Sequence, residues 1–123
     1  MRALKRGDFK IARDYFEMAL NEAREIGNKD AESVSLGNLG LAYKSLSDFK
    51  KAIEFHQLAL RIAKYTGNKD GEGSLYNNLG SAYQSLSDFK KAIEFHQLAL
   101  RIAKDTGNKD GEGTTYNLSL IHI

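Results

Sequence analysis

The sequence predicts an all-α fold, an α-solenoid of stacked antiparallel helix pairs. Three observations lead to this prediction. The chain repeats itself with a period of 40 residues, it contains no proline among its 123 residues, and its apolar residues recur at three- and four-residue steps. A period of this length is typical of solenoids, in which each unit contacts only its neighbours. The short spacing is typical of helices that bury one face.

The repeat divides the chain into units. Residues 34–73 and 74–113 differ at only seven positions, and "SLSDFKKAIEFHQLALRIAK" occurs in both. The same shift applied backwards recovers a diverged half-copy. We therefore expect an array over residues 1–117, followed by a non-repeat tail, Leu118–Ile123. Within the array we expect a half unit at 7–28, units at 29–68 and 69–108, and the start of a further unit at 109–117.

The two ends of the array do not complete a unit, so the sequence predicts a fragment of a longer array. The repeat would continue as "NLG" after residue 117, but the chain reads "LSLIHI". Whether this tail is native sequence stays open.

The first expected helix covers residues 8–26. Two pairs follow, at 29–46 with 48–65 and at 69–86 with 88–105. A glycine with positive φ would end each long helix, at Gly27, Gly67 and Gly107. The next residue offers a side-chain oxygen as the N-cap of the following helix, at Asn28, Asn68 and Asn108. Within a pair, Ser47 or Asp48 would cap the second helix, and so short a turn makes the two helices antiparallel.

The second helix of a pair is apolar on two faces, so it is expected to touch two neighbours. One stripe contains Phe49, Ala52, Ile53, His56, Ala59, Leu60 and Ala63, and the other contains Phe55, Leu58 and Ile62. The first helix has one apolar side, formed by Leu36, Leu39, Gly40, Tyr43 and Leu46.

These units resemble the tetratricopeptide repeat. The matching positions are Leu39, Gly40, Tyr43, Ala52 and Ala59 in one copy and Leu79, Gly80, Tyr83, Ala92 and Ala99 in the next. The long period and "NLG-AY" are more similar to a subgroup that includes Partner-of-Inscuteable-type and kinesin-light-chain-like arrays. Two features depart from the family pattern: Leu36 and Tyr76 replace the usual Trp or bulky residue, and the proline after the second helix is absent.

Differences between the copies suggest a binding surface. Four of the seven fall at three- and four-residue steps along one side of the first helix; we call these eight residues the variable stripe. They are Val34, Gly37, Leu41 and Lys44 in one unit and Ser74, Asn77, Ser81 and Gln84 in the next. The resemblance implies that this stripe lines a concave groove that receives a peptide or a partner helix. Drift of an unused exposed surface is the alternative.

Asn38 and Asn78 adjoin the stripe and are the same in both copies. An asparagine amide can bind a peptide backbone through both its donor and its acceptor. A hydrogen bond to the next helix or its loop is an equally good interpretation. With these two residues, the candidate groove comprises ten positions.

No chemistry of catalysis or of metal binding stands out. His56 and His96 lie in the apolar stripe, and zinc would need further ligands at helical spacing that the sequence lacks. We expect packed, hydrogen-bonded histidines. "GNKDGEG" lacks the Lys-Ser/Thr of a P-loop and the spacing of an EF-hand, so it is interpreted as a loop and cap. We expect no enzyme activity and no cofactor.

Charge and composition limit the classes of partner that the sequence predicts. Eighteen Lys and Arg oppose sixteen Asp and Glu, and the formal charge of +2 gives no reason to expect binding to nucleic acid or to a membrane surface. The chain has no cysteine and no apolar run of membrane-spanning length, and its first ten residues lack the apolar segment typical of a signal peptide. A cytoplasmic location is therefore the default expectation.

The predicted function is that of a scaffold or adaptor that binds a peptide or partner helix in the concave groove. The paired Lys and Asn clamp of chaperone-binding relatives is not reproduced, so chaperone binding is not expected. Two alternatives stay open. The chain could self-associate end to end through uncovered helix faces, or it could be a sensor segment of a larger multidomain protein.

Overall fold

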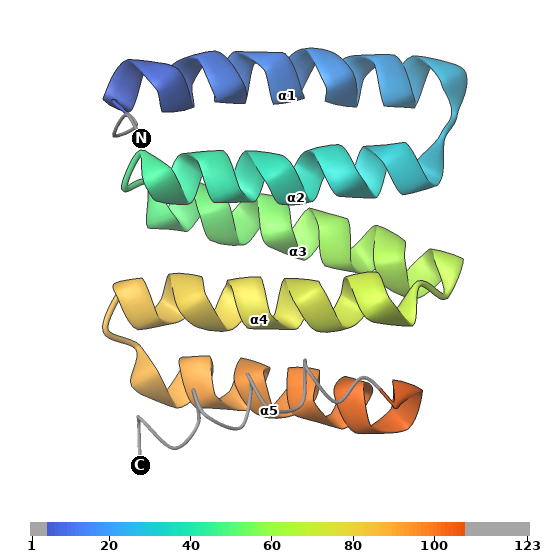
Figure 1. The fold of residues 1–123 in the computed structure, drawn as a ribbon, viewed down its shortest axis with the longest axis vertical. Helices are drawn as coiled ribbons and strands as arrows, with labels where there is room; N and C mark the ends of the chain where they lie inside the picture. Colours follow the sequence, from blue (N-terminus) through green and yellow to red (C-terminus); the bar gives the residue numbers. More distant parts are fainter. Residues whose placement is uncertain (1–4, 108–123) are drawn as a thin grey trace.

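The computed structural model describes residues 5–107, which form helices stacked in chain order (Figure 1). These helices are α1 (Arg6–Ile26), α2 (Lys29–Ser45), α3 (Phe49–Thr66), α4 (Lys69–Ser85) and α5 (Phe89–Thr106). Each packs against the next, and α2 also touches α4. The described part of the chain contains no strand, so the predicted all-α solenoid is confirmed, with helix bounds within two residues of those expected. The further unit expected at 109–117 and the tail at 118–123 lie outside the described residues.

Glycine ends the three long helices as predicted. Gly27, Gly67 and Gly107 have φ of 71°, 73° and 75°, in the left-handed region that residues with a Cβ avoid. The expected asparagine caps are present on the helices that follow. The Asn28 side chain accepts a hydrogen bond from the Ala31 N–H at 3.0 Å, and the Asn68 side chain accepts one from the Gly71 N–H at 3.0 Å. Asn108 lies outside the described residues.

The turn within each pair is capped by aspartate. The Asp48 side chain accepts a hydrogen bond from the Lys51 N–H at 3.2 Å, and Asp88 makes the same bond with Lys91. Of the two candidates that the sequence offered, Asp48 is therefore the cap. Ser47 instead takes a left-handed backbone conformation, with φ of 64°, and this reverses the chain within two residues.

Removing the Asp48 cap should destabilise the fold measurably. We expect Asp48→Ala to lower the free energy of unfolding by about 1 kcal/mol, because the first-turn N–H of Lys51 loses its acceptor. Urea denaturation followed by circular dichroism measures this change. The exposed neighbour Lys50 provides the control, since Lys50→Ala should change stability much less. Equal stability of Asp48→Ala and the unmodified chain would contradict the capping role.

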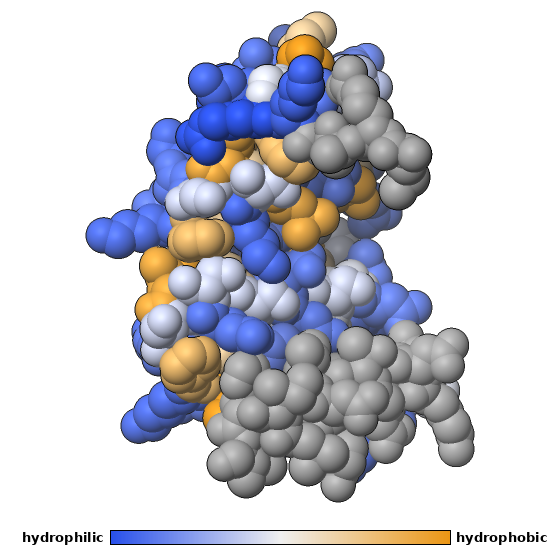
Figure 2. All heavy atoms as spheres, turned by 60° about the vertical axis from the view of Figure 1, so that its left-hand side comes forward, coloured by the Kyte–Doolittle hydropathy of each residue, from blue (hydrophilic) through white to orange (hydrophobic). Residues whose placement is uncertain are grey.

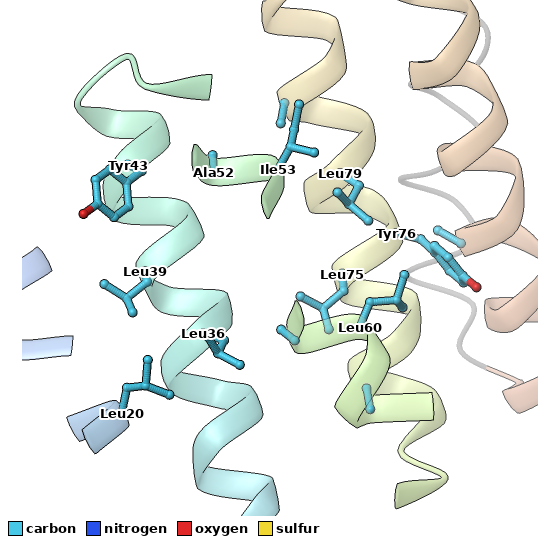
Figure 3. Packing of buried hydrophobic residues seen from close by; sticks show 14 residues of the cluster. Leu20, Leu36, Leu39, Tyr43, Ala52, Ile53, Leu60, Leu75, Tyr76 and Leu79 are labelled. Atoms are coloured by element: carbon cyan, nitrogen blue, oxygen red, sulfur yellow. The ribbon is translucent and has the colours of Figure 1, made fainter. Parts of the chain in front are cut away.

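Buried apolar side chains form one core that runs through all the described pairs (Figure 3). Leu36 and Leu39 of α2 and Leu79 of α4 are fully buried, together with the alanines on the facing helices. Phe55 and Ile62 of α3 pack partly against this core, as expected for a helix with two neighbours. Leu58 was predicted to belong to the same face but keeps 38% of its surface exposed, so it is less completely packed than Phe55 and Ile62.

The two helices of a pair approach closely where a glycine faces a histidine. A Cβ added to Gly40 would lie 2.4 Å from His56 Cε1, and one added to Gly80 would lie 2.7 Å from His96 Cε1. Real Cβ atoms do not approach other atoms so closely. The glycine of the "NLG" motif therefore sets the distance between the two helices of each pair.

Candidate functional site

The variable stripe on α2 is accessible along its length. Val34 and Leu41 are exposed, at 61% and 43%, and Gly37 and Lys44 are half-buried. On α4, Ser74 is exposed, and the other three stripe residues, Asn77, Ser81 and Gln84, are half-buried. None of the eight is enclosed in the core, which leaves the stripe available to a partner.

The remaining differences between the copies are of another kind. Ser35 and Leu36 of α2 are buried, and so are their counterparts Leu75 and Tyr76 of α4. These changes alter how one pair packs on the next, so they concern the core. The last difference, Tyr65 against Asp105, lies at exposed positions near the ends of α3 and α5.

The candidate groove residues of α2 lie toward two different neighbours. A Cβ on Gly37 would lie 3.6 Å from Leu75 Cδ2, so Gly37 faces α4. Asn38 and Leu41 instead line an open pocket of about 200 Å³ against α1, together with Phe9, Ala12, Phe16, Ala42 and Ser45. The structure therefore brings Asn38 and Leu41 together at the α1 side of α2.

On α4, Ser74 and Asn77 share a pocket of about 60 Å³ with residues of α5. The other lining residues are Asp70, Gly73, Ala99, Ile102, Ala103 and Thr106. Ser81 lies one turn further along, where its backbone carbonyl accepts a hydrogen bond from the Ser85 hydroxyl at 3.1 Å. The α4 half of the stripe is therefore more polar than the α2 half and has a smaller hollow.

Asn38 and Asn78 are half-buried at the edge of the stripe. Within residues 5–107, neither side-chain amide forms a hydrogen bond with a neighbouring helix or loop, which was the alternative that the sequence left open. Each amide keeps its donor and its acceptor for another group.

The two buried histidines differ in their partners. Both rings are fully buried. His96 Nδ1 lies 3.0 Å from Asn77 Oδ1, a hydrogen bond, whereas neither ring nitrogen of His56 has a partner in the described part of the chain. The prediction of packed, hydrogen-bonded histidines is thus correct for His96, and its hydrogen-bond part is wrong for His56. The reason is that Gly37 occupies the position of Asn77 in the earlier unit and has no side chain to offer.

Burial lowers the pKa of the His56 ring. Desolvation of the ring, with a smaller contribution from the positive charge of Lys44, lowers the pKa of His56 to about 4. The ring is therefore neutral at neutral pH. Sequence reasoning assigned Gly37 and Asn77 only to the groove. It missed that the residue at this position also decides whether the buried histidine has a hydrogen-bond partner. The sequence does show that the two histidines are identical while Gly37 and Asn77 differ. That this position lies next to the histidine becomes visible only in the folded pair.

The surface around the pairs is mixed in character. Figure 2, in which the side with the α2–α3 and α4–α5 turns comes forward, shows hydrophobic groups interspersed with hydrophilic ones. Leu86 and Phe89 are exposed at the α4–α5 turn.

Across residues 5–107, no three His, Cys, Asp or Glu side chains cluster as a metal site would require. None of the described helices has the length and apolar character needed to cross a membrane.

Several solved structures are similar to this chain. The tetratricopeptide repeat domain of Arabidopsis FLU aligns with a TM-score of 0.75 and 22% identity over 80% of this chain and 82% of that one. A STAND signal-transduction ATPase with a tetratricopeptide repeat sensor, from Pyrococcus horikoshii, aligns with a TM-score of 0.84 and 24% identity over 93% of this chain but 18% of that one. BtubC (BKLC) from P. vanneervenii aligns with a TM-score of 0.71 and 22% identity over 94% of this chain and 57% of that one. At these identities the likeness concerns the fold alone.

The sequence was also compared with curated proteins and with models of protein families. No curated protein matches the chain. Two models of the tetratricopeptide repeat do match, one over residues 3–64 and the other over residues 75–110. The first alone spans half of the chain, and the matched regions contain the close glycine–histidine approaches described above. The chain therefore belongs to the tetratricopeptide repeat family.

Proposed function

We propose that this chain is a non-catalytic protein-recognition module that binds a peptide or partner helix along the variable stripe, with Asn38 and Asn78. Tetratricopeptide repeats generally mediate protein–protein interaction, and this supports the proposal at the level of the family. The observation that carries it is the accessibility of the stripe. The eight residues of the stripe differ between otherwise near-identical copies, and all of them lie outside the core.

The chemistry of these side chains indicates the kind of ligand. Val34 and Leu41 offer exposed apolar contact, and Lys44 offers a positive charge nearby. The free amides of Asn38 and Asn78 can bind a peptide backbone. A ligand with an apolar anchor and an acidic group close to it fits this combination. The proposal includes a cytoplasmic adaptor role and a place in the long-repeat subgroup with Partner-of-Inscuteable-type and kinesin-light-chain-like arrays, but no nucleic acid or membrane partner.

A sensor role is the second candidate. It is favoured by the alignment of 93% of this chain with the STAND protein, whose tetratricopeptide repeats are described as a sensor. In that case the stripe would receive a regulatory ligand and pass the signal to an attached domain. End-to-end self-association is a further alternative, and light scattering over a concentration series would reveal it as a rising mass.

Selection from a displayed peptide library tests the groove directly. We expect the selected peptides to lose about tenfold or more in affinity for the double variant Lys44→Glu with Asn78→Ala, because it reverses one charge and removes one backbone-binding amide. Lys50→Glu changes an equally charged residue on the exposed side of α3 and should bind as before. Unchanged affinity of the double variant would contradict the assignment of the groove.

A further inference from the structure

An open hollow lies between the first turn of α2 and the last turns of α3. It has a volume of about 370 Å³ and is lined by Lys29, Arg61, Ile62 and Tyr65. Tyr65 is 84% exposed, more than any other large hydrophobic side chain among residues 5–107. Leu58 lies on the same side of α3, one turn before Ile62, and is also exposed. An apolar strip therefore runs along α3 and ends at the hollow.

The hollow belongs to the interior of the array. α3 packs against both α2 and α4, so both of its neighbours in the stack are in place while Tyr65 stays uncovered (Figure 1). None of the four lining residues belongs to the variable stripe. An exposed aromatic ring beside a hollow is stabilised when an apolar group covers it and removes it from water. The hollow is therefore a candidate binding site separate from the groove.

Both charged residues that line the hollow are positive. Lys29 Nζ lies 3.4 Å from Glu32 Oε1, and Arg24 Nε of α1 lies 3.3 Å from Oε2 of the same carboxylate, so two cations share one anion. Arg61 is exposed and forms no ion pair within residues 5–107. The hollow therefore has positive charge that the described part of the chain does not neutralise, and this favours an acidic ligand.

The next unit lacks this combination. The 40-residue shift places Lys69, Arg101 and Ile102 at three of the four lining positions, but it places Asp105 at the position of Tyr65. Asp105 is exposed and lies one turn after Arg101, so in that unit the chain itself supplies an acidic group near the arginine. The earlier unit has an aromatic ring instead, which leaves Arg61 to a carboxylate of another molecule.

We propose that the hollow formed by Lys29, Arg61, Ile62 and Tyr65 binds an acidic peptide segment that contains an aromatic side chain. The aromatic side chain of the ligand lies against Ile62 and stacks on Tyr65. Carboxylates on either side of it bind Arg61 and Lys29.

Single-stranded nucleic acid also combines negative charge with rings that stack. A peptide is favoured, because only two of the lining residues are cations and the formal charge of the whole chain is +2. A phosphate backbone is bound through many more positive groups than this. The apolar strip that continues to Leu58 also suits a peptide, whose side chains include apolar ones.

A capped peptide, Glu-Glu-Phe-Glu-Glu, serves as the probe and is titrated into the isotopically labelled 123-residue chain. We expect saturable changes of amide chemical shift around Lys29, Arg61 and Tyr65, with a dissociation constant of about 1 mM or lower. A matched peptide with glutamine in place of each glutamate keeps the ring and loses the charge. It should bind about fivefold more weakly or worse.

Substitutions in the two units test the lining residues. Tyr65→Asp gives the hollow the residue of the next unit and should weaken binding about tenfold, whereas Tyr65→Phe keeps the ring and should bind as the parent does. Arg61→Glu should weaken binding several-fold. Arg101→Glu makes the same change within the same local sequence of the next unit and should leave the affinity unchanged. All three positions are exposed, so the variants should keep the circular dichroism spectrum of the parent.

Four results would overturn the proposal. They are the absence of saturable changes up to ~5 mM peptide, equal affinities for the glutamate and glutamine peptides, equal affinities of Tyr65→Asp and the parent, and tighter binding of a thymidine oligonucleotide at the same residues. The last result would assign the hollow to nucleic acid.

A further variant separates this site from the proposed groove. The double variant Lys44→Glu with Asn78→Ala should bind the probe as the parent does, because neither residue lines the hollow. If that variant alone lost the probe, the peptide would lie in the groove, and the proposal for the hollow would be wrong while the proposed groove stood.

Discussion

Replacing Gly40 with alanine is expected to lower the free energy of unfolding by about 2 kcal/mol. The added Cβ would lie 2.4 Å from His56 Cε1 and 2.6 Å from His56 Nδ1. The His56 ring is fully buried in the core, so relief requires the two helices to separate. Alanine also favours the helix by about 1 kcal/mol relative to glycine, and the clash must exceed this gain for the prediction to hold. Urea denaturation of the parent and the variant measures the difference.

Gly37 provides a control in the same helix. A Cβ at Gly37 would lie at ordinary contact distance, 3.6 Å, from Leu75. Gly37→Ala should therefore raise the free energy of unfolding by about 0.5–1 kcal/mol, because only the helix propensity changes. Opposite signs for two identical substitutions three residues apart would locate the close approach at Gly40. A Gly40→Ala variant as stable as the parent would show that the helices are not held at this distance.

Acidification is expected to destabilise the chain through His56. The pKa of this ring is lowered to about 4 in the folded state, whereas a histidine in the unfolded chain titrates near 6.5. Between these two values the unfolded state binds a proton that the folded state does not, so stability falls as the pH is lowered from above 6.5 to 4. The histidine contributes roughly 3 kcal/mol to this fall, which levels off below pH 4.

The variant His56→Phe isolates this contribution from the titration of carboxylates, which both proteins share. Phenylalanine is the residue at the corresponding place in α1, Phe16. Chemical denaturation at several pH values between 7 and 4 should show a smaller loss of stability for His56→Phe than for the parent, by roughly 3 kcal/mol. Parallel curves for the two proteins would mean that the ring is not held neutral by burial.

The helices and their ends could be predicted from the sequence because they depend on neighbours within a few residues. Gly67 ends α3 through its own φ, and Asn68 caps α4 through a bond to the N–H three residues on. The repeat also made the stacking of the helix pairs predictable, since two nearly identical units must pack in nearly identical ways. These features need no knowledge of contacts between distant residues.

The histidine environments could not be predicted in the same way. His56 and His96 have identical flanking sequences, yet only His96 has a side-chain partner, Asn77, in the preceding helix. The prediction of hydrogen bonding used the chemistry of histidine without knowing which residue of the first helix would lie opposite. That pairing is set by the crossing of the two helices, which single-sequence spacing does not fix.

The candidate groove was predicted as one stripe, and its residues do lie outside the core. Helical spacing alone did not reveal that Gly37 faces α4 while Leu41 borders α1. The uncovered outer side of α1 could be expected from the half unit at the start of the array, and Tyr15 is exposed there, at the position where Phe55 of α3 is stacked on Tyr43.

The proposed ligand-binding surface is the variable stripe. Amide chemical shifts of the isotopically labelled chain, measured while a selected peptide is titrated, test it most directly. The largest changes should fall on residues of α2 and α4 around Val34, Asn38, Leu41 and Asn78. Changes concentrated instead on the exposed side of α3, around Lys50, Glu54 and Arg61, would contradict it.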